Sequence, residues 1–280
     1  MEIINKNFKI KKYTKPYPYI VFENFFDINF YQMIEKKFPN LEDFEKYPNK
    51  INRMNFDTSF PEELYNKLTS EVSEYQTLHE YIYSKKFMEY FIKIFEKDIK
   101  NEISEGNLKN VLAYDLNCDP YEVHKIYSKK DLEENFKTKI LYPRLDIGAG
   151  IKGYGKNTGG KGIHVDNPQR LISILFYSGG YSKIIGGELR IWEKQSEKLK
   201  ISNIIKPKSN TLVASLQNNI SFHDVNPVID ISGSRNAFYI AISANEPIWK
   251  KIDNNKFNIK YHKNRVTKKS KLSSLLDIFR

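Results

Sequence analysis

The sequence predicts a mainly β fold, a jelly-roll core braced by N-terminal α-helices. Apolar residues recur at helical spacing before about residue 135, whereas short β segments separated by Gly, Asn and Pro follow residue 138. Many short strands with such turns are typical of jelly rolls, and 280 residues suffice for a large core. We expect a supporting strand and helices over 1–135, the jelly-roll core over 136–250, and a basic tail over 251–280 whose apolar spacing permits a short helix.

The N-terminal part is expected to contain a strand and three supporting helices. Asp27 can cap the first helix, which ends at Pro39. Pro61 and the acidic residues after it open a second helix that runs to about Tyr75. The third helix carries an apolar stripe that should pack into the core and brace the outer sheet, formed by Phe87, Phe91, Ile94 and Phe95.

The core part contains the segments that we expect to be strands, namely 140–147, 171–177, 188–192, 199–205, 211–216 and 238–242. A short segment over 162–167 is expected to be a further strand, preceded by a Gly-rich approach. The loop from Lys152 to Gly162 has five Gly in eleven residues, which suggests a mobile lid as a hypothesis.

Three side chains of the core form a candidate metal site. Successive strand residues point to opposite faces, so His164 and Asp166 would share one face with Val165 turned away. His223 follows 57 residues after Asp166. Two imidazoles and one carboxylate form the facial triad of non-haem Fe(II) sites, which leaves coordination positions open. A His-x-Asp triplet is common by chance, but here Gly-rich turns and apolar strands surround it.

Arg235 is a candidate anion-binding residue beside this site. It lies 12 residues beyond His223 and opens an apolar strand that we expect over Asn236 to Ser243. A hairpin of that length returns the chain beside itself, so the guanidinium should lie on the order of 5–10 Å from the metal. A dicarboxylate that chelates the metal would offer its other carboxylate to Arg235 as a bidentate, charge-assisted partner.

With these motifs, residues 138–246 resemble the double-stranded β-helix core of the 2-oxoglutarate- and Fe(II)-dependent dioxygenases. The family's pattern is His-x-Asp, a distal His and a basic residue on the following strand. Residues 17–26 are also similar to the opening of prolyl-hydroxylase-like members. The resemblance implies that His164, Asp166 and His223 bind iron and that Arg235 binds the C5 carboxylate of 2-oxoglutarate. It also implies O2 as a co-substrate, succinate and CO2 as products, and ascorbate as an auxiliary reductant to be considered.

Positions at which the sequence differs from the family's patterns indicate which subfamilies it does not resemble. Many members have Ser two residues after the Arg, and its hydroxyl shares the co-substrate carboxylate. This chain has Ala237 at that position, so Tyr142 or Tyr177 is expected to be the second donor to the carboxylate beside Arg235, and together they form the carboxylate clamp. Collagen-type prolyl hydroxylases usually have Lys in place of Arg235. Nucleic-acid demethylases carry a second Arg where this chain has Ala241, and halogenating relatives lack the carboxylate of the His-x-Asp pair, which is present here. The expected reaction is therefore hydroxylation of an unactivated C–H bond.

The expected substrate is a small biosynthetic metabolite or a sugar-linked intermediate, with a protein side chain as the second choice and nucleic acid as the third. Arg144 either faces the cavity and holds an anionic substrate or pairs with Asp146 at the surface. The Trp192 side chain either contacts the substrate or packs against neighbouring residues of the fold. The residues that we expect to contact substrate are Arg144, Asn167, Gln169, Arg190 and Trp192.

Two other classes of protein remain open at this stage. A cupin-like metal-binding isomerase or sensor would use the same scaffold but would not need Arg235 at this spacing. A non-catalytic binding module would be indicated by loss of one of the four site residues, and all four are present.

Composition agrees with a soluble enzyme. The net charge of +11 is concentrated toward the C-terminus, where a basic run over 260–271 is expected to be solvated, so nucleic acid is not the expected partner. A lone Cys118 excludes an intramolecular disulfide and fits a reducing cytoplasm. The sequence has no apolar stretch long enough to span a membrane, and Met1 to Ile4 lack a secretory pattern. A cytoplasmic location is expected.

Overall fold

The structure is a computed structural model of the chain, in which residues 3–46, 54–57, 62–120, 138–153, 162–196 and 198–250 are described. The expected solvated run over 260–271, the expected C-terminal helix and most of the expected Gly-rich lid lie outside these residues. Within the described residues, no helix is both long and apolar enough to cross a membrane.

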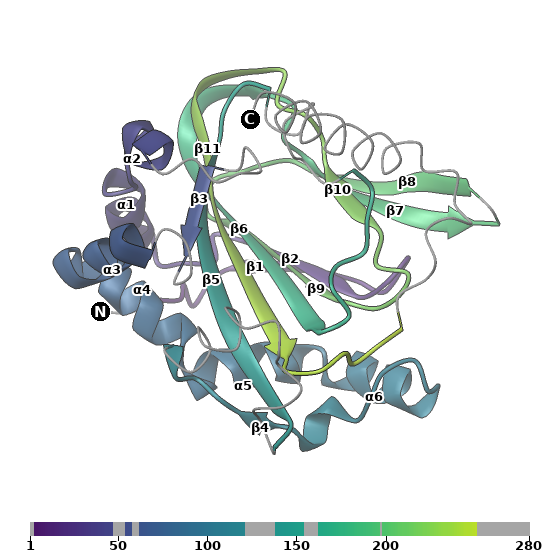
Figure 1. Ribbon diagram of the computed structural model, residues 1–280. Coiled ribbons are helices and arrows are strands. Elements are labelled where there is room, and N and C mark those ends of the chain that lie inside the picture. Colours follow the sequence, from purple (N-terminus) through teal and green to yellow (C-terminus); the bar gives the residue numbers. More distant parts are fainter. Residues whose placement is uncertain are drawn as a thin grey trace, which may run out of the picture.

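The N-terminal half supplies most of the helices and several strands (Figure 1). In chain order these elements are β1 (Lys9–Tyr13), β2 (Tyr19–Glu23), α1 (Ile28–Lys36), α2 (Leu41–Lys46), β3 (Met54–Asp57), α3 (Glu62–Glu71), α4 (Ser73–Ile82), α5 (Lys85–Ile94), α6 (Glu96–Ser104), the 3₁₀ turn η1 (Val111–Ala113) and β4 (Asp115–Leu116).

The second half of the described chain is β structure. Its strands are β5 (Ile140–Gly150), β6 (Arg170–Ile185), β7 (Leu189–Gln195), β8 (Lys198–Ile205), β9 (Thr211–Leu216), β10 (His223–Val225) and β11 (Asp230–Ala244). Every core strand expected from the sequence is found at its place except the segment 162–167. That expectation was wrong, because only His164 forms a bridge there, an isolated one to His223.

The expected helices are present with one correction. Asp27 caps α1, since its Oδ1 atom accepts hydrogen bonds from the backbone N–H groups of Asn29 at 3.0 Å and Phe30 at 3.3 Å. The segment expected to be one helix to about Tyr75 is two helices, α3 and α4, because Val72 adopts an extended backbone conformation between them. The aromatic stripe of α5 is buried, as expected, with Phe87, Phe91 and Phe95 each at most 1% exposed.

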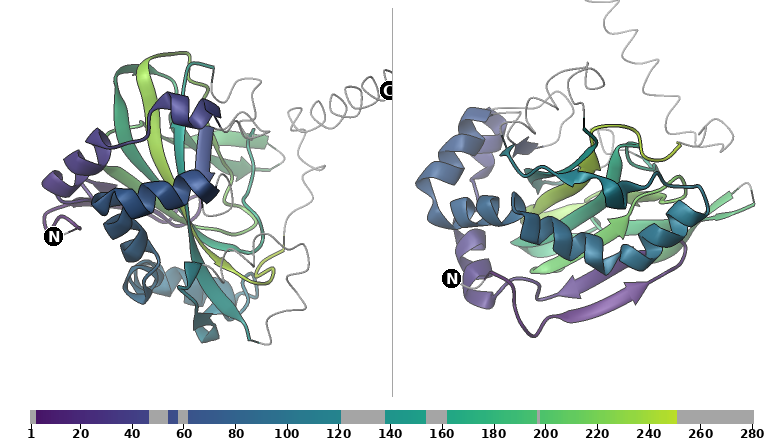
Figure 2. Two further views of the ribbon diagram at one scale, coloured as in Figure 1. Left: turned by 60° about the vertical axis from the view of Figure 1, so that its left-hand side comes forward. Right: turned by 90° about the horizontal axis from the view of Figure 1, so that it is seen from below.

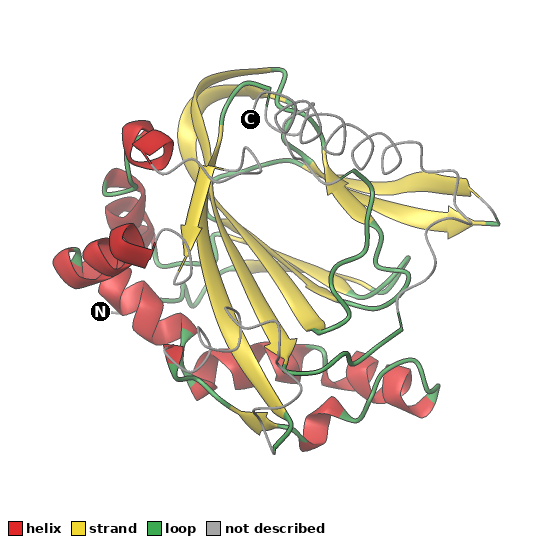
Figure 3. Ribbon diagram, viewed as in Figure 1, coloured by secondary structure: helices red, strands yellow, loops and turns green. Residues whose placement is uncertain are grey.

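Two sheets face one another, and helices cover the outer side of the larger one (Figures 2 and 3). The large sheet has the strand order β1-β2-β9-β6-β11-β5-β3, with β4 added beside β5, and the smaller one has the order β10-β7-β8. Strands β1 and β2 therefore extend the large sheet next to β9, so the N-terminal segment contributes to the sheet as well as to its support. This arrangement is the mainly β, jelly-roll type of fold that the sequence predicts.

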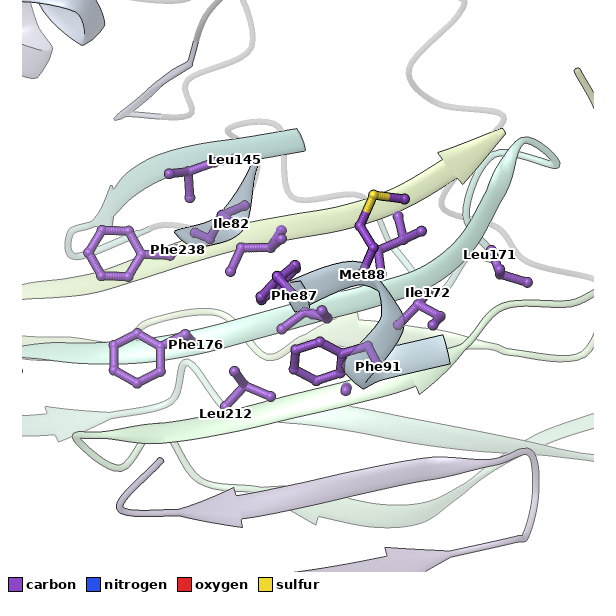
Figure 4. Close-up of a cluster of buried hydrophobic side chains, with 14 of the residues drawn as sticks. Ile82, Phe87, Met88, Phe91, Leu145, Leu171, Ile172, Phe176, Leu212 and Phe238 are labelled. Atoms are coloured by element: carbon purple, nitrogen blue, oxygen red, sulfur yellow. The ribbon is translucent and has the colours of Figure 1, made fainter. Parts of the chain in front are cut away.

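The outer face of the large sheet carries the main hydrophobic core. Figure 4 shows Phe176, Phe238, Leu145 and Leu212 from the sheet lying close to Phe91 and its neighbours on the helices. The rings of Phe176 and Phe238 on adjacent strands are stacked with their centroids 5.6 Å apart. Burial of this apolar surface fixes which face of each strand points outward, and hence which residues face the smaller sheet.

The inner face of the large sheet carries a second apolar cluster, which lies between the two sheets. In it, Tyr177 and Val213 pack against Leu189 and Ile191 of β7. Strands β6 and β11 extend past this cluster and curl toward the smaller sheet (Figure 1). Their pairing is interrupted by register shifts around Gly233, where Gly233 and Gly180 have φ values of +100° and +84°. A Cβ atom on Gly233 would lie 2.2 Å from the Gly180 carbonyl oxygen, so the close approach at this bend requires glycine.

Candidate metal centre

His164, Asp166 and His223 converge on the inner side of the fold. Their candidate ligand atoms all lie within 4.8 Å of one another. The His164 Nε2 atom is 3.8 Å from Asp166 Oδ1, and the His223 Nε2 atom is 3.9 Å from Asp166 Oδ2. Among the described residues this is the one group of His, Cys, Asp and Glu side chains arranged to hold a metal ion.

Reciprocal backbone hydrogen bonds bring the two histidines together. The His164 N–H donates to the His223 carbonyl at 3.0 Å, and the His223 N–H donates back to the His164 carbonyl at 2.9 Å. This single bridge attaches the loop that carries His164 and Asp166 to β10 of the smaller sheet. The two imidazole rings consequently lie side by side, with centroids 4.5 Å apart.

The hydrogen bonds of both imidazoles leave their Nε2 atoms suited to metal binding. The Nδ1 atom of His164 lies 2.8 Å from the Gly162 carbonyl oxygen, and that of His223 lies 2.9 Å from the Ser221 carbonyl oxygen. A carbonyl oxygen only accepts hydrogen bonds, so each Nδ1 carries the proton, and in the neutral ring the Nε2 lone pair then points into the cluster. This pattern is the one that orients metal-binding histidines.

The Asp166 carboxylate is buried and held by two neighbours that the sequence reasoning missed. The Ser173 hydroxyl on β6 donates to its Oδ2 atom at 2.5 Å, and the Arg170 Nη1 atom lies 3.1 Å from the same oxygen. Tyr17 also lies near this carboxylate. Burial, with smaller contributions from Tyr19 and Asp166, raises the pKa of Tyr17 well above its ordinary value, so its hydroxyl stays protonated.

Arg235 is fully buried on β11 and oriented by fixed partners. Its Nε atom donates to the Gly187 carbonyl at 3.1 Å, its Nη1 atom donates to the Tyr239 hydroxyl at 3.1 Å, and its guanidinium carbon lies 4.8 Å from the Tyr177 ring centroid. Gly187 has a φ of +77°, and a Cβ atom there would lie 3.0 Å from the Arg235 Cδ atom. The turn before β7 therefore needs glycine to let the arginine pass.

Of the two tyrosines expected to complete the clamp, the structure brings Tyr177 to Arg235. The Tyr177 hydroxyl is buried, and its closest polar neighbours are Arg235 and the backbone of Leu189. Burial raises the pKa of Tyr177, and the charge of Arg235 opposes this shift. Tyr142 instead pairs in register with Ser243, eight residues along β11 from Arg235, on the order of 25 Å away along the strand.

The partners of Arg235 and the His164–Asp166–His223 site lie on the same face of the large sheet. Tyr239, which Arg235 contacts, is opposite Leu175 in the β11–β6 register, and Leu175 is two residues from Ser173. Two residues along a strand correspond to about 7 Å. The partners of Arg235 and of the Asp166 carboxylate, Tyr239 and Ser173, are therefore about one such step apart along the sheet, and the distance of about 5–10 Å expected from the sequence between the guanidinium and the metal stays a prediction.

Arg144 pairs with Asp146, one of the two arrangements that the sequence left open, and its contact with an anionic substrate stays a prediction. Its Nε atom lies 2.8 Å from Asp146 Oδ1, and both side chains are partly buried. Arg144 pairs in register with Ala241, whose other neighbour is Ser173, so the ion pair is on the face that carries the metal cluster. Arg144 on β5 and Ser173 on β6 are thus separated across the sheet only by Ala241 of β11, which has a small side chain.

The other expected substrate contacts are divided between the segment after Asp166 and the smaller sheet. Asn167 is exposed and directly follows the loop that carries His164 and Asp166, the metal loop. Its Oδ1 atom accepts a hydrogen bond from the Gln169 N–H at 3.2 Å. Arg190 and Trp192 both donate to the buried Asp224, the residue after His223, with the Trp192 Nε1 atom at 2.8 Å. Their polar groups therefore support β10, and a direct contact with substrate stays a prediction.

The comparisons with known proteins give similarities to solved structures only. No family model matches the chain, and no curated protein matches it. A prolyl 4-hydroxylase from Phytophthora capsici is similar over 80% of this chain and 58% of its own, with 15% identity and a TM-score of 0.48. A 2OG-Fe(II) oxygenase family oxidoreductase from Burkholderia pseudomallei is similar over 44% of this chain and 52% of its own, with 17% identity and a TM-score of 0.28.

A prolyl-4-hydroxylase from Pseudomonas putida is similar over 47% of this chain and 68% of its own, with 18% identity and a TM-score of 0.28. The chain thus spans between about half and three fifths of the first two of these structures. By their descriptions, two of these structures are prolyl 4-hydroxylases and one is a 2OG-Fe(II) oxygenase family protein.

Proposed function

We propose that this chain is an Fe(II)- and 2-oxoglutarate-dependent dioxygenase that hydroxylates an unactivated C–H bond. The observation that carries the proposal is the pairing of two features on one face of the fold. A His-Asp-His group with both imidazoles oriented for metal binding shares the inner face with a fully buried arginine, whose partner Tyr239 lies opposite Leu175, two residues from the Asp166 partner Ser173. A metal-binding isomerase or sensor would need the first feature and not the second.

The residues fit Fe(II) in their donor chemistry. Two neutral imidazoles and one carboxylate from His164, His223 and Asp166 supply three nitrogen or oxygen ligands and leave positions for other ligands. The described residues include one cysteine, Cys118, which lies against Met88 with the sulfur atoms 3.6 Å apart and is not part of the cluster. With bound Fe(II), 2-oxoglutarate and O2, such a site supplies oxidative decarboxylation to succinate and CO2 coupled to hydroxylation.

The residues also fit 2-oxoglutarate. Arg235 supplies a planar guanidinium whose orientation is fixed by Gly187 and Tyr239, and the buried Tyr177 hydroxyl is available as a further donor. Arg235 and Tyr177 would hold the distal carboxylate and direct the keto-acid end toward the metal, while the apolar cluster around Val213 and Leu189 excludes water.

We propose a small biosynthetic metabolite or sugar-linked intermediate as the substrate. Support comes from the Arg144–Asp146 ion pair, which faces the metal side of the sheet, and from the exposed Asn167 directly after Asp166. The ion pair would orient a charged group of the substrate beside the metal, across the short Ala241 side chain. A protein side chain is the alternative substrate class for the same chemistry.

The test is anaerobic binding followed by turnover of the full chain. We expect Fe(II) and 2-oxoglutarate together to give a metal-to-ligand charge-transfer absorption. Admission of O2 should then release succinate, at a rate that rises with the correct member of a panel of metabolites and peptides. Asp166→Ala should give neither signal. Tight metal binding without any binding of 2-oxoglutarate would refute the dioxygenase assignment and favour the cupin-like alternative.

A further inference from the structure

A chain of hydrogen-bonded polar groups connects Asp166 with His223 behind the metal site. It begins at the Asp166 carboxylate. The Ser173 hydroxyl on β6 donates to the Asp166 carboxylate. The backbone carbonyl of Ser173 accepts a hydrogen bond, at 3.4 Å, from the hydroxyl of Ser215, which lies directly opposite on β9. One metal-binding carboxylate is therefore linked through β6 to the end of β9.

The same set of groups ends at His223. The His223 Nδ1 atom lies 2.9 Å from the Ser221 carbonyl oxygen, which fixes the imidazole orientation. The Ser221 hydroxyl lies 2.9 Å from Gln217 Oε1 and 2.8 Å from the Asn218 carbonyl oxygen, and it accepts from the Asn218 N–H at 3.2 Å. The turn that presents His223 is thus closed around the Ser221 hydroxyl.

Gln217 joins these two ends. Its Nε2 atom donates to the Ser215 hydroxyl at 2.8 Å and its Oε1 atom accepts from the Ser221 hydroxyl, while its own N–H donates to the Leu171 carbonyl at 2.8 Å. The Ser215 hydroxyl proton is directed at the Ser173 carbonyl, so this hydroxyl must accept from Gln217, which assigns the amide orientation. Gln217 and Ser221 are both fully buried.

We infer that Gln217 is a positioning residue for the metal site, which fixes His223 through Ser221 and couples it to Asp166 through Ser215 and Ser173. The inference rests on the proposed metal binding. The hydrogen bonds of Gln217 to Ser215 and Ser221 bridge the two ends of this buried network, which holds the turn before β10 in one arrangement. Loss of a partner behind a metal ligand typically costs about 10- to 100-fold in metal affinity.

The test separates positioning from simple stabilisation by comparing two buried amides. Asn245 also makes two buried hydrogen bonds, from the Ile140 N–H at 3.1 Å and to the Thr138 carbonyl at 3.0 Å, but it contacts none of the metal-site residues. Gln217→Leu and Asn245→Leu should both lower the unfolding midpoint of the metal-free chain. Only Gln217→Leu should weaken Co(II) binding, by about 10- to 100-fold in anaerobic titrations, and change the Co(II) d–d spectrum.

Ser221→Ala provides a smaller perturbation of the same connection and decides the question if Gln217→Leu does not fold. It should weaken Co(II) binding in the same direction, by about tenfold. Parent-like Co(II) affinity and spectrum in folded Gln217→Leu, or in Ser221→Ala when it alone folds, would overturn the inference and leave the proposed function standing. Failure of the parent chain to bind Co(II) or Fe(II) would overturn both.

Discussion

Replacement of Arg235 tests the part of the site that distinguishes an oxygenase from other metal proteins of this fold. The side chain is fully buried, it donates to Gly187 and Tyr239, and it lies over the Tyr177 ring. A carboxylate of 2-oxoglutarate held there would be equally desolvated. Arg235→Ala would therefore leave a buried charge without its counter-ion.

The size of the effect follows from that burial. Removal of one partner of a buried ion pair costs about 3–5 kcal/mol, which corresponds to about 10²–10⁴ in affinity. Arg235→Lys keeps the charge but loses the planar fork and the contact with the Gly187 carbonyl, so its affinity should fall between those of the parent and Arg235→Ala. Fe(II) affinity without co-substrate should change little in both variants.

The assay is anaerobic titration of the Fe(II)-loaded chain with 2-oxoglutarate, followed by absorption or calorimetry. The control is Fe(II) binding by each variant, together with its thermal unfolding, which shows that the fold and metal cluster persist. If Arg235→Ala binds 2-oxoglutarate as tightly as the parent, the clamp is elsewhere and the dioxygenase proposal loses its main support.

Three further outcomes are expected. Tyr177→Phe should weaken 2-oxoglutarate binding by about 10- to 100-fold in the same titration, because a hydrogen bond to a charged group contributes about 1.5–3 kcal/mol; an unchanged affinity would exclude the hydroxyl from the clamp. Asp166→Ala should abolish succinate release, and full turnover in this variant would refute the metal assignment. Burial by itself raises the pKa of Glu246, but Lys109, Tyr114 and Lys139 lower it to about 2, so its stabilising effect is present above about pH 4.5 and is lost as the pH falls toward 2. Glu246→Gln should therefore cost about 1 kcal/mol or less at pH 7 in denaturant unfolding and nothing near pH 2, and a cost independent of pH would contradict this reasoning.

The convergence of His164, Asp166 and His223 could be predicted from the sequence because two of the three residues are local to one segment and the turns and apolar strands around them are typical of this fold. His164 and Asp166 are two residues apart, and His223 and Arg235 lie close together in the chain. The partners of these residues could not be predicted in the same way. Ser173 on β6 reaches Asp166 in the preceding loop because of how that loop folds back, and Tyr239 reaches Arg235 four residues away on β11, beyond the register shift near Asn236; single-residue patterns specify neither.

The errors in secondary structure have local physical reasons. Residues 162–167 alternate like a strand, but the structure pairs only His164 with another segment, so the strand does not form there. The apolar spacing from α3 into α4 is continuous, and the extended conformation of Val72 that separates these helices leaves no mark on it. Strands β6 and β11 run through Ser- and Gly-containing stretches that look like turns in the sequence, because bulges accommodate them.

The attachment of the metal loop to β10 has a consequence for how the fold opens. Strand β10 has three residues, and His223 begins it, whereas Asp166 is tied to the large sheet by Ser173. A metal ion bound by both side chains would act as a crosslink between the sheets. It would stabilise the closed state by about 2.7 kcal/mol at a free metal concentration of about 100 Kd. The amides of β7, β8 and β10 should then exchange with solvent as one cooperative unit whose protection rises with metal, while the helices over the outer face exchange independently of it.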